Sequence, residues 1–175
     1  MDPSRGSFWR SVCLAIVVLG LLSLLEGSGQ LRLGRVGLAP DLVLSAVIAW
    51  AFLSDSSNGA LWGFVGGLML DSLSSGPFGA YALALGAVGA LVGGGRLSLY
   101  ADVRTWGAVV GASGAALFYA LLLLLMALSG WGAPLLQTVR LIVLPAVAMD
   151  TICVVLLITP MRALQRRFPP SPATS

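Results

Sequence analysis

Apolar residues in this chain form long runs that do not alternate with polar ones, and short polar or Gly/Pro-rich stretches separate the runs. Strict alternation would favour the strands of an outer-membrane barrel, whereas unbroken runs favour membrane helices. The pattern predicts a single all-α domain over residues 1–167 and a disordered Pro/Ser tail over 168–175. The six expected transmembrane helices span residues 8–25, 42–53, 59–70, 78–92, 105–128 and 140–161.

The second and third predicted helices are unusually short. The apolar run 42–53 has 12 residues, or about 18 Å at the helical rise, against a hydrocarbon core of about 30 Å. Either Asp41 lies inside the membrane region, or other helices shield this one. Short, glycine-interrupted helices point to a binding site in transporters, but close packing alone is the other explanation. The last helix is interrupted in character by Pro145.

The third helix has a glycine at every fourth position, namely Gly59, Gly63 and Gly67. This spacing makes a smooth groove on one helix face into which a second helix can pack closely. We hypothesise that one such stripe receives the single membrane helix of a partner protein. Stripes of the same spacing occur on the fourth and fifth helices, at Ala82, Gly86 and Ala90 and at Gly107, Gly111 and Ala115.

Composition supports a membrane location. The chain is 58% hydrophobic and only 10% charged, with a mean hydropathy of +0.96, whereas about a quarter of the residues of a soluble domain are charged. All ten basic residues are arginines at the predicted membrane edges, which indicates topology rather than nucleic-acid binding. With both termini cytoplasmic, the inside receives Arg5, Arg10, Arg96, Arg104, Arg162, Arg166 and Arg167, and the outside receives Arg32, Arg35 and Arg140.

The N-terminal segment has features of a signal peptide, because Arg5 and Arg10 precede an apolar run at 12–25. Glu26 and the lack of a small-residue cleavage site favour an uncleaved first transmembrane helix instead.

Three aspartates stand out among the apolar residues. Asp150 lies near the middle of the last helix, where a carboxylate costs about 2.5–3.5 kcal/mol, so it is either an ion or partner contact or a structural residue paired with Arg140. Asp41 follows Pro40 and is placed to cap the second helix. Asp71 either pairs with backbone N–H groups of the 72–76 turn or contacts a partner at the hairpin tip.

Residues for catalysis or metal binding are not apparent. Residues 111–114 match the G-x-S-G written around the nucleophile of intramembrane serine proteases, but the chain has no histidine or lysine to act as the base. Phosphate-binding and metal-binding motifs are also missing. We therefore expect no catalytic residue, cofactor or metal, and we interpret Cys13 and Cys153 as small buried residues.

Several motifs lie between residues 40 and 83. They are Pro40-Asp41-Leu42, then Gly63-Phe64, Gly66-Gly67, Asp71, Ser74, Gly76-Pro77 and Gly79 of a hairpin over residues 63–79, and Ala82-Leu83. Together they resemble the rod shape-determining protein MreD family, and a looser likeness extends over residues 36–165. The resemblance implies a multi-pass protein of the bacterial inner membrane. It would bind MreC and, through MreC, a glycosyltransferase/transpeptidase pair and the MreB cytoskeleton, in addition to membrane lipids.

The family also looks related in fold to the substrate-binding subunits of vitamin transporters, which leaves an alternative function. In that case the chain would be the binding subunit of a transporter for a small molecule or a lipid precursor. A polar-lined cavity that opens outward would favour the transporter, whereas a filled core and a wide apolar groove on the lipid face would favour a scaffold.

Overall fold

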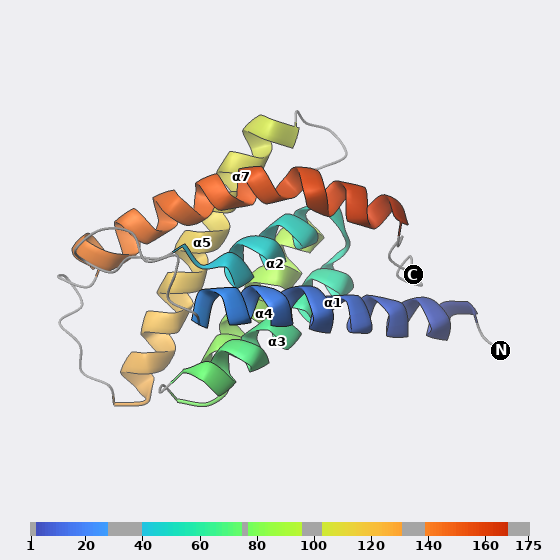
Figure 1. Ribbon diagram of the computed structural model, residues 1–175. Helices are drawn as coiled ribbons and strands as arrows, with labels where there is room; N and C mark the ends of the chain where they lie inside the picture. Colours follow the sequence, from blue (N-terminus) through green and yellow to red (C-terminus); the bar gives the residue numbers. More distant parts are fainter. Residues whose placement is uncertain (1–2, 28–39, 75–76, 96–102, 131–138, 168–175) are drawn as a thin grey trace.

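The computed structural model describes residues 3–27, 40–74, 77–95, 103–130 and 139–167. Within these ranges it contains six α-helices, one π-helical turn and no strand. The first described helix begins and the last one ends at the same end of the helical bundle (Figure 1). The elements are α1 Pro3–Gly27, α2 Leu42–Leu53, α3 Ser56–Leu73, α4 Ala80–Gly94, α5 Val103–Leu128, the π-helical turn η2 Val139–Val143 and α7 Leu144–Arg167.

The short helix α2 lies at the centre of the fold and contacts all five other α-helices. Each of its residues from Val43 to Phe52 is buried. Its bounds agree with the predicted run 42–53. The other helices shield it, which is one of the two explanations given above for its short length. Trp50 of α2 stacks on Trp62 of α3 with ring centroids 4.0 Å apart and an interplanar angle of 13°.

The helices α3 and α4 pack backbone against backbone. A Cβ atom at Gly59 would collide with the carbonyl oxygen of Gly89, and one at Gly63 would collide with that of Leu85. A Cβ at Gly67 would meet the Cα of Ala82. We call this contact, of Gly59, Gly63 and Gly67 with Ala82, Leu85 and Gly89, the α3–α4 seam.

Two expectations about the helices were wrong. The third helix is not short, because α3 has 18 residues and extends beyond the predicted 59–70 at both ends. Pro145 does not break the last helix, since η2 leads directly into α7. Pro145 is the second residue of α7, so the change from π- to α-type hydrogen bonding falls where proline has no N–H to donate.

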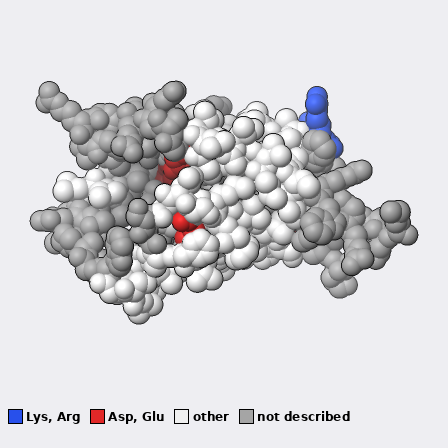
Figure 2. All heavy atoms as spheres, turned by 60° about the horizontal axis from the view of Figure 1, so that its bottom comes forward, with Lys and Arg blue, Asp and Glu red and all other residues white. Residues whose placement is uncertain are grey.

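Two helical segments are long and apolar enough to cross a membrane, Thr105–Leu128 and Leu141–Arg167. Shorter apolar segments are Val12–Glu26, Leu42–Leu53 and Ala80–Gly94. On the face drawn in Figure 2, arginine atoms and carboxylate atoms lie apart. The visible arginine atoms lie at one end, and the visible carboxylate atoms lie sunk among uncharged neighbours towards the other (Figure 2). The described arginine side chains at the first of these ends belong to the last turns of α7.

Candidate functional site

The N-terminus of α2 is held by carboxylates. Asp41 has extended backbone geometry, and its Oδ1 accepts a hydrogen bond from the backbone N–H of Leu44 at 2.7 Å. Asp41 is therefore the N-cap of α2, which confirms the sequence-based interpretation.

Asp150 is fully buried and both of its carboxylate oxygens are engaged. Oδ1 accepts a hydrogen bond from the backbone N–H of Asp41 at 2.8 Å, and Oδ2 accepts one from the hydroxyl of Tyr119 at 2.9 Å. The Ser45 hydroxyl donates to the backbone oxygen of Asp150 at 3.3 Å. These bonds support the structural interpretation of Asp150, although with different partners from the one expected. The side chain of Arg140, the suggested partner, lies outside the described residues.

Glu26, at the end of α1, completes this arrangement. Its carboxylate lies near the backbone N–H groups of Leu42 and Val43, the first two residues of α2, and interacts with both. The first N–H groups of a helix have no partner within the helix, and the hydrocarbon region has no water to replace one. A carboxylate also interacts favourably with the positive end of the helix dipole. Glu26 belongs to α1, Asp41 is the N-cap residue of α2, and Asp150 belongs to α7. We call these three carboxylates the α2 cap.

Sequence reasoning missed Glu26 and Tyr119 as members of this cluster. No second acid lies beside Asp150 at helical spacing in the sequence, so nothing near it along the chain indicates a cluster. The signal that was present is the position of Glu26 at the end of one apolar run and of Asp41 at the start of the next. The end of one helix and the start of the next antiparallel helix lie at the same end of a bundle, so Glu26 and Asp41 are expected to lie at the same end.

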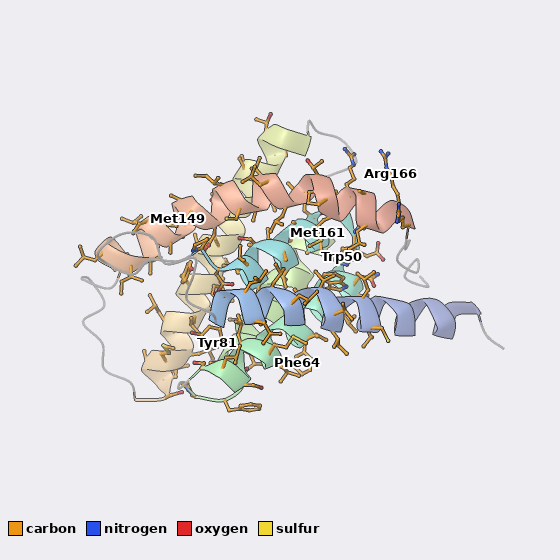
Figure 3. The ribbon with its side chains drawn as sticks, viewed as in Figure 1. Trp50, Phe64, Tyr81, Met149, Met161 and Arg166 are labelled. Carbon is orange, nitrogen blue, oxygen red and sulfur yellow. The ribbon has the colours of Figure 1, made fainter. Side chains whose placement is uncertain are left out.

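Beside the α2 cap lies a pocket of about 260 Å³, which we call the acidic pocket. It lies where α1 and α3 end and where α2 and α4 begin. Tyr81 in its wall is near the end of the bundle away from the termini (Figure 3). The lining residues are Ser23, Glu26, Asp41, Leu70, Leu73, Ser74 and Tyr81.

Asp71 caps the neighbouring helix rather than its own turn. Its carboxylate oxygens accept from the backbone N–H groups of Tyr81 at 3.1 Å and Ala82 at 3.0 Å, both in the first turn of α4. The expectation of backbone donors is thus confirmed, but these donors lie in α4 and not within residues 72–76. Gly79 adopts a left-handed conformation (φ 95°) that glycine tolerates, and Pro77 accepts from the N–H of Ala80 at 3.2 Å. Gly76 lies outside the described residues.

The stripes of small residues on α3 and α5 face neighbouring helices, whereas of the α4 stripe only Ala82 is buried and Gly86 and Ala90 are half-buried. The α3 stripe forms the α3–α4 seam with α4, and on α5 Gly107 and Gly111 face Ile158 and Val154 of α7. The α3 stripe is therefore not free to receive a partner helix, because α4 already occupies it.

One groove containing small residues remains open between α4 and α5, with a volume of about 210 Å³. We call it the α4–α5 groove. Its Ser113 is exposed, and the Ser113 hydroxyl donates to the carbonyl oxygen of Val109 in its own helix at 2.8 Å. This bond is consistent with a packing role for the G-x-S-G sequence. The lining residues are Leu91, Val92, Gly95, Val110, Ser113, Gly114 and Leu117.

The two cysteines are free, and Cys13 is exposed, so the expectation that both are buried was wrong. Among the residues that the structure describes, no group of three or more acidic or cysteine side chains is placed to hold a metal ion.

A family model described as rod shape-determining protein MreD matches residues 9–168. The chain belongs to the MreD family. Comparisons with curated proteins and with solved structures give no match. MreD proteins are bacterial membrane proteins that determine rod shape, and the family is structural and not known for catalysis. The resemblance inferred from the 63–79 hairpin is thereby confirmed.

Proposed function

We propose that this MreD protein is a non-enzymatic scaffold of the bacterial inner membrane, which binds MreC and thereby connects lateral peptidoglycan synthesis to the MreB cytoskeleton. The observation that carries this proposal is the family match over residues 9–168. The buried core that surrounds α2 supports it further, because a filled interior suits a protein that works through its outer surface.

The proposed topology has six membrane crossings and both termini in the cytoplasm. Two observations support it: the start of α1 and the end of α7 lie at the same end of the bundle, and Arg162, Arg166 and Arg167 lie at that end (Figures 1 and 2). Positive residues favour the cytoplasmic side. In this orientation the α2 cap and the acidic pocket lie towards the outer face.

The α4–α5 groove is the proposed docking site for the membrane helix of MreC. Helix association in lipid depends on close van der Waals contact, which small residues permit. The small-residue stripes of α3 and α5 are filled by neighbouring helices, whereas Ser113 and Gly95 leave the α4–α5 groove open at the surface.

Co-purification of MreC with this protein from a membrane that contains both tests the proposal. Ser113→Leu fills the α4–α5 groove, and Ala148→Leu adds a similar side chain at an exposed position of α7 as the matched control. We expect the first substitution to remove most of the bound MreC and the second to leave it unchanged. If Ser113→Leu protein folds and retains MreC, the helix docks elsewhere, and if wild-type protein captures no MreC, the scaffold function is wrong.

The second candidate function is the binding subunit of a small-molecule transporter, for which the acidic pocket would be the binding site. Ligand pockets for drug-sized molecules have volumes of about 300–1,000 Å³, so a pocket of about 260 Å³ is small for such a ligand. A purified protein that holds a small molecule and ignores MreC would favour the transporter over the scaffold.

A further inference from the structure

The acidic pocket contains hydrogen-bond acceptors that nothing in the described structure satisfies. The hydroxyl oxygen of Ser23 is buried, with 3% of the residue exposed, and has no hydrogen-bond partner. Oε2 of Glu26 is also buried and has no partner. Both residues line the pocket. A buried polar atom without a partner costs free energy, so these two atoms indicate a missing group.

The backbone of α2 cannot supply that group. The N–H groups of Leu42 and Val43 already interact with Glu26, and that of Val43 also interacts with Asp41. The N–H of Leu44 is bonded to Asp41, and that of Asp41 to Asp150. The missing partner must therefore come from outside the α2 cap.

The charge around the pocket defines what the missing group is. Glu26, Asp41 and Asp150 lie close enough for their charges to interact. The arginine side chains that the structure describes lie at the opposite end of the bundle (Figure 2). Carboxylates crowded in a low-dielectric site repel one another, and a positively charged donor relieves this repulsion while forming strong hydrogen bonds.

We propose that the acidic pocket binds a single ammonium or guanidinium group, with Glu26 Oε2 and Ser23 Oγ as its acceptors. Leu70 and Leu73 in the wall contact the carbon atoms attached to that group. A volume of about 260 Å³ accommodates the cation and a short alkyl stem. The cation is either a free organic amine or a basic side chain of a partner protein. The site goes beyond the scaffold function and does not depend on it.

Thermal unfolding of the purified full-length protein in detergent tests the site. The probe is propylguanidinium, and the control compound is propylurea, which has a similar shape but no charge. A ligand that binds only the folded state raises the unfolding midpoint with concentration. We expect a saturable rise with propylguanidinium and none with propylurea.

Two substitutions locate the effect. Glu26→Gln keeps an acceptor for the backbone of α2 but removes the charge, and we expect it to weaken propylguanidinium binding about tenfold or more, the loss of a charged hydrogen bond. Ser23→Ala removes an acceptor that has no bond in the structure, so we expect it to weaken binding without lowering the midpoint of the free protein. Asp55→Asn, outside the pocket, is the matched control and should bind like wild type.

Three results overturn the proposal: no rise in the midpoint, an equal rise with propylurea, or unchanged binding by Glu26→Gln. A response that appears only in an Arg32→Gln/Arg35→Gln variant also overturns it, because the chain then supplies its own cation. If binding is confirmed, co-purification of MreC with the Glu26→Gln variant shows whether the natural cation is a partner side chain or a free amine. Loss of MreC from Glu26→Gln assigns the cation to a partner side chain, and retention assigns it to a free amine.

Discussion

The α3–α4 seam and the α2 cap hold neighbouring helices together by opposite means. In the seam, glycines bring two backbones into direct contact, so that one added carbon atom would collide. In the cap, carboxylates from separate helices accept the hydrogen bonds that the start of α2 cannot make internally. In lipid, apolar burial does not drive helices together, so association depends on close van der Waals contact, as in the seam, and on hydrogen bonds between helices, as in the cap. The stability of the seam therefore depends on the space between the two backbones, and the stability of the cap depends on the number of satisfied hydrogen bonds.

Asp71 adds a carboxylate cap of the second kind beside the α3–α4 seam. It lies near the end of α3, and its carboxylate caps the first turn of α4, so the seam closes at one end with a carboxylate cap of its own. The same device thus serves both α2 and α4, the two helices whose N-termini border the acidic pocket.

Gly63→Leu should have the largest effect, because the new side chain would meet the backbone carbonyl of Leu85, which cannot rotate away. We expect a loss of more than about 4 kcal/mol in stability, seen as failure to recover folded protein from the membrane. Gly86→Ala is the matched control on the partner helix, since its Cβ would lie 3.8 Å from the nearest atom. Equal yields of the two variants would contradict the close contact.

Asp150→Ala tests the cap. It leaves the N–H of Asp41 and the hydroxyl of Tyr119 without their acceptor, at about 1–3 kcal/mol for each buried group. We expect a large fall in the unfolding midpoint in detergent, and a smaller one for Asp150→Asn, which keeps an acceptor. If Ala and Asn behave alike and near wild type, the cap does not stabilise the fold.

Asp71→Ala should cost about 1–2 kcal/mol, the typical effect of losing a helix cap. The measurement is again the unfolding midpoint. Ser72→Ala is the control, because the Ser72 hydroxyl bonds only within its own helix, to Leu68. If Ser72→Ala lowers the unfolding midpoint as much as Asp71→Ala does, the effect of Asp71→Ala does not come from the lost cap of α4.

Tyr119→Phe should have the smallest effect, about 1 kcal/mol, because it removes one hydrogen bond to Asp150 and leaves the second oxygen bonded. In an Asp150→Ala background the same substitution should change the midpoint hardly at all. A full additional loss there would show that the two side chains act independently.

Local features of the fold were predictable. The bounds of α2 follow from its apolar run, and the cap of Asp41 follows from a carboxylate placed directly before that run. The hairpin motifs led to the MreD family, which the family model confirms. The extra turns of α3 were not predictable from hydropathy, because they consist of polar residues such as Ser56 and Asn58 at one end.

By itself, the sequence determined the apolar runs, the fourfold spacing of the glycines and the positions of the acids, because these depend on neighbours along the chain. Only the tertiary structure decided what those features meet. Asp41 and Asp150 are 109 residues apart, yet one donates a hydrogen bond to the other. The tertiary structure also decided that the α3 stripe faces α4 and not a partner protein. Periodicity shows which residues share a helix face, but the packing of all helices around α2 determines what covers that face.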